Sequence, residues 1–315
     1  MVKVSVIVTV RNEENSVLHL LHSLENQSLK PYEVIIVDGG STDRTVEVVK
    51  SFINSRDSSF RLILAEGANR SKGRNMGISV VTSEIVACTD AGVVLDKFWL
   101  ENLVKPLIDG DADFVGGVYV QSGKSLLQQC VGILQYSNLE KLRVENFLPS
   151  SRSVAFKKSV WKSIGGYPEN LEKAEDTYFD LMVKEKGFKV SLAKNALVFW
   201  PARDSLKGLF LQYFSYAEWD VKAGLVLKLK IYRLLFLSYF FLAFLLFCTF
   251  KFGYLGFLLF FFAVLTYLIF SGVKAFRKTG KFSSFFIAMA IKVTIFLAET
   301  FGLIKGLIGR VSKGK

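Results

Sequence analysis

The first part of the chain alternates between short apolar runs and amphipathic segments. Four runs, rich in β-branched or other apolar residues, predict strands at Val4–Val10, Tyr32–Val37, Arg61–Leu64 and Glu84–Asp90. Between the first two strands, apolar residues from Val17 to Leu24 recur at helical spacing. Strands that alternate with helices predict an α/β domain with a mainly parallel sheet.

Polar clusters follow three of these predicted strands. They run from Thr9 to Glu14, from Asp38 to Asp43 and from Thr89 to Gly92. Because ligands of open parallel sheets bind beyond the carboxyl ends of the strands, the clusters predict a binding site at that edge. The fingerprint G-x-G-x-x-G does not follow the first strand, which argues against a Rossmann dehydrogenase.

The last third of the chain contains long apolar runs bracketed by basic residues. Residues 234–250 and 252–273 carry no charge, and a helix needs about 20 apolar residues to cross a bilayer. We therefore divide the chain into a domain of residues 1–221 and a membrane region of residues 222–315. Its first part is predicted to be a hairpin of two transmembrane helices, at about 232–250 and 253–273.

The distribution of charge predicts the orientation of this hairpin. The chain has a net charge of +12, and residues 222–315 contain 14 Lys or Arg residues and one acidic residue. Basic residues on both flanks predict that both flanks are cytoplasmic. The protein is thus expected in the cell membrane as a multi-pass protein whose first domain faces the cytoplasm.

A third apolar stretch, at about 282–308, carries Lys292 and Glu299. If it crossed the membrane, the basic residues from Lys305 onward would lie outside, against the positive-inside tendency. An interfacial helix is the favoured interpretation and a third membrane helix is the alternative.

Composition excludes other classes of protein. Positive charge that surrounds apolar runs favours anionic lipid headgroups, and residues 1–221 show no basic stripe with interleaved aromatics, so no nucleic-acid partner is expected. The three cysteines are widely spaced, which suits a reducing compartment. The first apolar run meets Arg11 at once and is not expected to be a signal peptide.

Five segments in the first 220 or so residues resemble motifs of the family 2 glycosyltransferases, in the family's order. They are Val6–Glu14, Val37–Asp43, Gly73–Ile78, Thr89–Gly92, and Gly165–Glu169 followed by Glu175 and Asp176. The resemblance implies the GT-A fold and the transfer of a sugar from a nucleotide-sugar donor. Residues 38–43 and 200–217 most resemble the succinoglycan-biosynthesis-type glucosyltransferase subgroup.

The D-x-D motif of the family holds Mg²⁺ or Mn²⁺, and Asp90 stands at its first position. By resemblance Asp90 binds the cation or the donor ribose; a turn-forming Asp at a strand end is the alternative. Gly92 replaces the second Asp of the motif. Water, phosphate oxygens or another residue would have to complete the metal shell.

The resemblance also implies further donor-binding residues. They are Thr9, Arg11, Glu13, Asp38, Arg70, Lys72 and Asn75. The counterpart of Asp38 accepts hydrogen bonds from the nucleobase, although Asp38 could instead form an Asx turn. Basic side chains at Arg70 and Lys72 suit a diphosphate, whereas Arg11 and Arg70 could equally be solvated loop residues.

By resemblance, Asp176 is the general base that takes the proton of the acceptor hydroxyl, with Glu175 as its supporting neighbour. Helix capping is the alternative for both residues. Direct displacement by the acceptor would invert the anomeric configuration.

The segment Gln212–Tyr216 lacks the Arg and Trp of the Q-x-x-R-W motif of processive members. Transfer of one sugar per encounter is therefore expected. Tyr213, Tyr216 and Trp219 could stack on the acceptor's sugar or lipid, or form an aromatic belt at the membrane.

Together these features predict an inverting, non-processive transferase that uses a nucleotide-diphosphate sugar, and the subgroup resemblance implies UDP in preference to GDP. The expected acceptor is a polyprenyl-linked glycan in the assembly of a cell-surface polysaccharide or glycoprotein glycan. A polyprenyl-phosphate sugar synthase is the first alternative. A non-catalytic nucleotide-sugar-binding scaffold is the second; Gly92 supports it, and Glu175 with Asp176 speaks against it.

Overall fold

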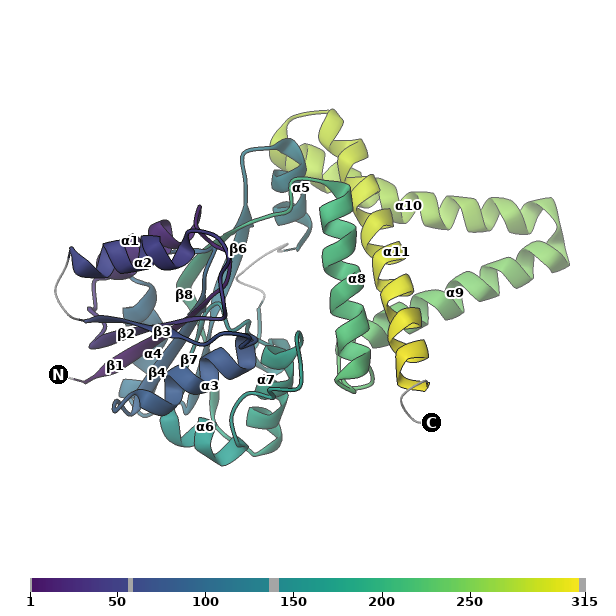
Figure 1. Cartoon of the computed structure of the whole chain (residues 1–315). Coiled ribbons are helices and arrows are strands. Elements are labelled where there is room, and N and C mark those ends of the chain that lie inside the picture. The colour runs from purple at the N-terminus through teal and green to yellow at the C-terminus, as the bar shows by residue number, and fades with distance from the viewer. Residues whose placement is uncertain (1, 56–58, 136–141, 312–315) are drawn as a thin grey trace. The chain divides into compact units, whose positions relative to one another are not determined.

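A computed structural model of the chain describes residues 2–55, 59–135 and 142–311 (Figure 1). The chain divides into two compact units. The first, called the sheet unit, comprises residues 1–121 and 138–201; the second, called the helical unit, comprises residues 122–137 and 202–315.

The sheet unit is built on one eight-stranded sheet with the order β3-β2-β1-β4-β7-β6-β8-β5. The strands are β1 (Val4–Val10), β2 (Glu33–Asp38), β3 (Phe60–Leu64), β4 (Ile85–Asp90), β5 (Val94–Leu95), β6 (Phe114–Ser122), β7 (Val154–Lys157) and β8 (Val190–Pro201). The four predicted strands are β1 to β4, and their neighbouring pairs β3–β2, β2–β1 and β1–β4 are parallel. This confirms the predicted mainly parallel α/β architecture.

The other half of the sheet contains strands that the sequence analysis did not predict. Strand β7 pairs antiparallel with both β4 and β6, and β5 pairs antiparallel with β8. These strands are short or separated in sequence from their partners, so local patterning does not predict their order.

Helices cover both faces of the sheet (Figure 1). They are α1 (Val17–Glu25), α2 (Thr45–Asn54), α3 (Arg70–Val80), α4 (Trp99–Ile108), α6 (Lys158–Ile164) and α7 (Glu175–Glu185), with a 3₁₀ turn η2 at Val144–Asn146. In β1, Val6 and Val8 pack into the core cluster with α1 and α4, whereas Ile7 packs into the cluster with α3 and α7. Burial on both faces explains why the central strands are apolar throughout.

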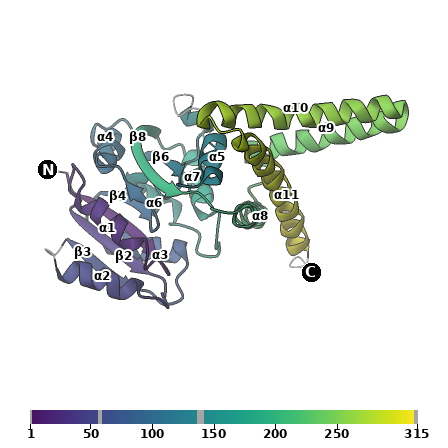
Figure 2. The same cartoon turned by 90° about the horizontal axis from the view of Figure 1, so that it is seen from above.

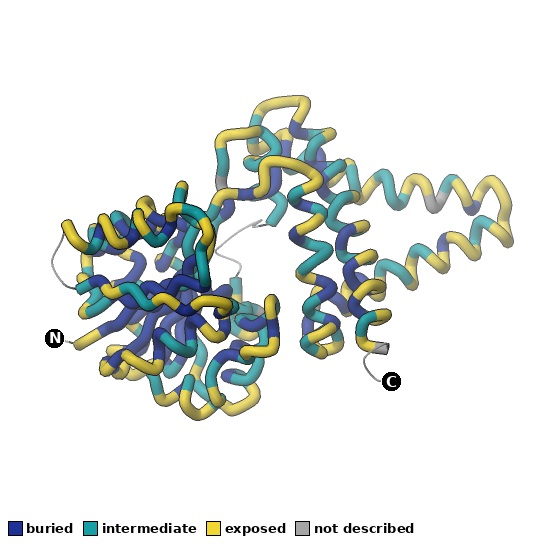
Figure 3. The backbone as a smooth tube through the Cα atoms, in the orientation of Figure 1, coloured by how far each residue is buried: buried dark blue, intermediate teal, exposed yellow. Residues whose placement is uncertain are grey.

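The helical unit contains α5 (Leu126–Gln135), α8 (Leu206–Lys222), α9 (Lys230–Phe252), α10 (Tyr254–Thr279) and α11 (Ser283–Val311). Helices α9 and α10 lie side by side (Figure 2). By length and composition α9, α10 and α11 can each cross a membrane. Many residues of α9 and α10 are exposed (Figure 3). Large apolar residues such as Phe240, Phe250 and Phe270 are among them, as on a lipid-facing surface.

Helices α8 and α11 pack closely inside the helical unit. A Cβ atom at Gly302 would lie 2.3 Å from the carbonyl oxygen of Phe214, so the two backbones approach too closely for a side chain there. Lys305 on α11 also forms an ion pair of 3.1 Å with Glu218 on α8. Helix α8 therefore groups with the C-terminal helices, whereas the sequence interpretation ended the first domain after Val221; the extent of the catalytic domain stays a prediction.

Candidate active site

The carboxyl ends of β1, β2 and β4 bring three polar clusters to one edge of the sheet. Thr9 lies in register with Val37 on one side and with Asp90 on the other, and Val10 lies in register with Asp38. Residues far apart in sequence are therefore neighbours at this edge, as the order of strands requires.

A buried arginine from α3 organises the site. Arg74 donates from Nη2 to Oδ1 of Asp90 at 2.6 Å, and from Nη1 to Oε1 of Glu175 at 2.8 Å. Only 1% of the Arg74 side chain is exposed. A buried guanidinium needs compensating charge, and these two carboxylates provide it. Arg74 thus fixes the end of β4 to the start of α7.

Electrostatics keep the Asp90 carboxylate ionised. Burial alone would raise the pKa of Asp90, but the charges of Arg74, Arg152 and Arg70 and the Arg74 hydrogen bond lower this pKa to about 2. For Glu175 the balance is opposite: burial and the neighbouring Asp176 raise its pKa, and Arg74 only partly offsets them. The two carboxyl groups that bind Arg74 therefore differ: the pKa of Asp90 is lowered, and the pKa of Glu175 is raised.

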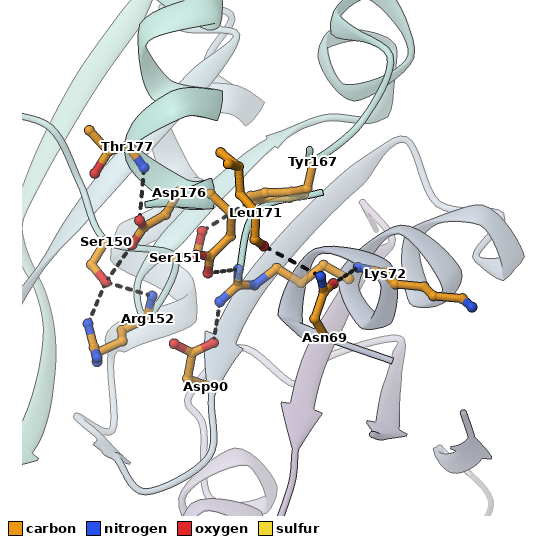
Figure 4. Close-up of polar contacts among 12 residues, drawn as sticks. Asn69, Lys72, Asp90, Ser150, Ser151, Arg152, Tyr167, Leu171, Asp176 and Thr177 are labelled. Atoms are coloured by element: carbon orange, nitrogen blue, oxygen red, sulfur yellow. Dashed lines mark hydrogen bonds and ion pairs between the residues drawn. The ribbon is translucent and has the colours of Figure 1, made fainter. Parts of the chain in front are cut away.

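Helix α7 begins with Glu175 and Asp176, and the preceding backbone is strained. Ala174 has φ of 62°, a left-handed conformation that costs a residue with a Cβ about 1 kcal/mol or more. Asp176 is half-buried; its Oδ1 accepts from the Thr177 amide at 2.8 Å and its Oδ2 from Ser150 Oγ at 3.4 Å (Figure 4). The carboxylate is therefore oriented and still accessible.

One turn further along α7, Asp180 is buried with only 2% of its surface exposed. Burial first, and then the charge of Asp176, raise the pKa of Asp180 well above its ordinary value. Its Oδ2 has no hydrogen-bond partner among the described residues. This environment favours the neutral form of the Asp180 carboxyl group over its ionised form.

The loop after β1 holds Arg11 and Glu13. Arg11 is exposed and Glu13 is half-buried. The Glu13 carboxylate lies beside Gly92, because a Cβ built there would be 3.3 Å from Oε2 of Glu13. An acidic group from the first loop thus occupies space next to the position where the second Asp of the motif is missing.

Asp38 shapes its own loop. Its Oδ1 accepts hydrogen bonds from the backbone amides of Gly40 and Ser41, at 3.0 and 2.9 Å, and its Oδ2 accepts from the Ser41 hydroxyl at 2.5 Å. This is the Asx-turn arrangement considered from the sequence. A contact with the nucleobase stays a prediction.

Asn75 uses all four hydrogen-bonding positions of its amide on the segment before α7. Nδ2 donates to the Tyr167 carbonyl and to Glu169, and Oδ1 accepts from Trp161 and the Tyr167 amide, all within 2.9 Å. Gly166 is needed here because its φ is 86° and a Cβ would lie 2.8 Å from Asn75 Oδ1. Asn75 therefore positions this loop, and a direct donor contact stays a prediction.

The other predicted residues occupy different surroundings. Arg70 is exposed at the start of α3, where its charge lowers the pKa of Asp90, whereas the exposed Lys72 points away from Asp90 in Figure 4. Tyr213, Tyr216 and Trp219 all belong to α8 in the helical unit. Their role in acceptor binding stays a prediction.

The residues at Asp90 fit a divalent cation that is shared with a ligand. Among the described residues, no group of three or more His, Cys, Asp or Glu side chains could hold a metal by itself. Mg²⁺, however, is commonly held by one or two carboxylates together with substrate phosphates and water. Asp90 Oδ1 accepts the hydrogen bond from Arg74, and the Asp90 carboxylate could supply the single protein ligand of such a shared cation.

Two arginines of the site were not identified as site residues from the sequence. Arg74 lies within the motif segment Gly73–Ile78, but the sequence does not single it out, because its partner Glu175 is 101 residues away in the chain. Arg152 belongs to none of the family motifs. The pairing of β7 with β4 places it near Asp90 and Asp176.

The chain is similar in sequence to known glycosyltransferases. Residues 5–148 match the profile of the family "Glycosyl transferase family 2". Glycosyltransferase AglE of Haloferax volcanii is 26% identical over 212 residues, which cover 64% of this chain and 67% of AglE. Succinoglycan biosynthesis protein ExoA of Rhizobium meliloti is 25% identical over 233 residues, covering 69% of this chain and 68% of ExoA.

Among solved structures, mannosyltransferase PcManGT from Pyrobaculum calidifontis, in complex with GDP-Man and Mn²⁺, has a similar fold. The TM-score is 0.57 at 21% identity, covering 71% of this chain and 64% of that chain. The chain thus spans about two thirds of the length of these proteins. Residues 5–148 thus match glycosyl transferase family 2, and the chain has a GT-A-like domain followed by three long apolar helices; ExoA is a distant relative.

Proposed function

We propose that this glycosyltransferase transfers one sugar, with inversion, from a nucleotide-diphosphate sugar to a polyprenyl-linked glycan. The observation that carries the proposal is the Arg74 bridge between Asp90 and Glu175, next to the accessible carboxylate of Asp176. Polysaccharide or glycoprotein glycan assembly at the cell surface is the proposed context. ExoA, named for succinoglycan biosynthesis, supports it.

On this proposal, the donor diphosphate binds near Asp90 and the acceptor hydroxyl approaches Asp176. Asp176 takes the proton of that hydroxyl as the oxygen attacks the anomeric carbon, and the nucleoside diphosphate leaves from the opposite side. Ser150 and the Thr177 amide hold the carboxylate in place. Arg74 fixes the base-bearing helix relative to Asp90.

A divalent cation, Mg²⁺ or Mn²⁺, is proposed to bind between Asp90 and the donor diphosphate. When bound it would neutralise charge on the leaving group. The complex of PcManGT with Mn²⁺ supports a cation in a protein of this fold. UDP is proposed over GDP from the subgroup resemblance, although PcManGT was solved with GDP-Man, so both donors belong in any test.

We also propose that α9 and α10 cross the membrane with both ends cytoplasmic, and that the C-terminal half of α11 lies at the membrane surface. Support comes from α8, which carries Glu218, Asp220 and Lys222 and is too polar to span. The C-terminal half of α11 packs against α8 through Gly302, Lys305 and Gly306. We therefore propose that it lies outside the bilayer core together with α8.

Product analysis with two acceptors tests the proposed substrate class. A short polyprenyl-diphosphate-linked sugar and a bare polyprenyl phosphate are incubated with the same donors. Glycosylation of the linked sugar alone is the expected result. A product from the bare phosphate alone would identify a polyprenyl-phosphate sugar synthase instead.

A further inference from the structure

Arg152 lies on the segment that leads into β7, inside the sheet unit, and is held against aromatic rings. Its guanidinium carbon is 4.0 Å from the centroid of the Trp200 ring and 5.5 Å from that of the Tyr119 ring. These two rings meet edge to face, with centroids 6.1 Å apart. Stacking on an aromatic face holds the planar guanidinium in one orientation. Arg152 is therefore a positioned cation.

The Arg152 guanidinium interacts with groups near both Asp176 and Asp90. Nη1 of Arg152 donates to Ser150 Oγ at 2.8 Å, and that hydroxyl donates to Oδ2 of Asp176 at 3.4 Å. Ser150 lies between Arg152 and Asp176 in Figure 4. The charge of Arg152 also contributes to the lowered pKa of Asp90. Arg152 is thus linked to the donor-side carboxylate and to the base.

Arg152 and Arg74 differ in a way that separates their roles. Arg74 is fully buried and pairs with Asp90 and Glu175, so it serves the architecture of the site. Arg152 is only half-buried, so a ligand that enters the site can reach it. A guanidinium can bind two phosphate oxygens through parallel hydrogen bonds, and sugar transfer from a nucleotide sugar brings phosphates to this point.

We propose that Arg152 binds a phosphate group at the reaction centre. The phosphate has two possible sources, the diphosphate of the donor and the phosphate next to the lipid of the acceptor. The inference rests on the proposed function, which assigns Asp90 to the donor and Asp176 to the acceptor. Nothing in the family motifs of the sequence marks Arg152.

The test uses the full chain in detergent with the variants Arg152→Gln and Arg152→Lys. Arg61→Gln is the matched control, because it removes one positive charge from a surface ion pair with Glu33. Calorimetry measures binding of UDP and GDP without acceptor, with uridine and guanosine as probes that lack phosphate. Steady-state kinetics then give the KM of a short polyprenyl-phosphate or polyprenyl-diphosphate-linked acceptor at saturating donor.

If the donor supplies the phosphate, Arg152→Gln weakens nucleoside diphosphate binding about tenfold or more and leaves nucleoside binding unchanged. If the acceptor supplies it, diphosphate binding is retained and the acceptor KM rises about tenfold or more. In either case Arg152→Lys restores only part of the loss, because it keeps the charge without the planar fork.

Two results would overturn the inference. The first is that Arg152→Gln keeps both its nucleoside diphosphate affinity and its acceptor KM within about twofold of wild type. The second is that Arg152→Gln loses as much affinity for uridine or guanosine as for the diphosphates, which would indicate a structural role. Melting temperatures monitor folding, and Arg152→Lys supplies the readout if Arg152→Gln is unfolded. A wild-type chain that binds no nucleoside diphosphate and turns over no donor would instead refute the proposed function itself.

Discussion

Arg74 on α3 donates a hydrogen bond of 2.6 Å to Asp90, and this pair is half of a connection between the end of the central strand β4 and helix α7, which carries the proposed base. The second bond of Arg74, to Glu175, completes the connection. Asp90 at the end of β4 and Glu175 at the start of α7 are therefore held together by one buried side chain.

Replacing Arg74 by Ala should destabilise the protein strongly. The change leaves the buried carboxyl group of Glu175 and the half-buried one of Asp90 without the Arg74 cation, and removing one partner of a buried ion pair typically costs about 3–5 kcal/mol. Thermal unfolding in detergent measures the effect. Arg61→Ala, which removes an exposed ion pair with Glu33, should change the melting temperature little. Equal effects of the two variants would contradict the organising role of Arg74.

Asp180→Asn should stabilise the protein increasingly as the pH rises. The folded-state pKa of Asp180 is raised, so the folded protein keeps this proton to a higher pH than the unfolded chain, in which the group ionises above about pH 4. Wild type therefore loses stability as the pH rises from there, and an isosteric Asn has no such loss. Melting temperatures of both proteins between pH 4 and 8 check this; a difference that is constant with pH would contradict the assignment.

Asp90→Asn should change the acid limb of the stability curve. The folded pKa of Asp90 is about 2, below its unfolded value, so its contribution is present above about pH 4 and is lost as the pH falls toward 2. The stability difference between wild type and variant should thus shrink over that range. A difference that persists at pH 2 would mean that Asp90 acts through packing rather than charge.

Asp176→Asn should retain nucleotide-sugar binding and lose transfer by about 10²- to 10⁴-fold, the usual contribution of a general base. Asp111→Asn, an exposed residue on the turn before β6, is the matched control. Binding is followed by calorimetry and transfer by product formation. Full activity in Asp176→Asn would remove this residue as the base.

Gly302→Ala should disturb the packing of α8 against α11, since the new Cβ would meet the Phe214 carbonyl at 2.3 Å. Gly309→Ala on the same helix meets no atom within 4 Å and should be neutral or slightly stabilising, because alanine favours the helix. Limited proteolysis in detergent compares the two. Equal protection of both variants would contradict the close approach.

The parallel half of the fold was predictable because each strand is a β-branched run that ends in polar residues. Val4–Val10 and Ile85–Asp90 carry that signal locally. Strand β7 does not, since its place between β4 and β6 depends on long-range pairing. For the same reason the sequence indicated Asp90, Glu175 and Asp176 by motif, but neither their bridge through Arg74 nor the approach of Arg152.

The most direct test of the account is release of nucleoside diphosphate from a panel of UDP- and GDP-sugars. The wild-type chain is assayed in detergent with a polyprenyl-linked acceptor, with and without Mn²⁺ or Mg²⁺, beside Asp176→Asn. We expect acceptor- and cation-dependent turnover of one donor by the wild-type chain, and donor binding without turnover by Asp176→Asn. Donor binding without turnover by the wild-type chain, with every acceptor tried, would contradict it and favour a nucleotide-sugar-binding scaffold.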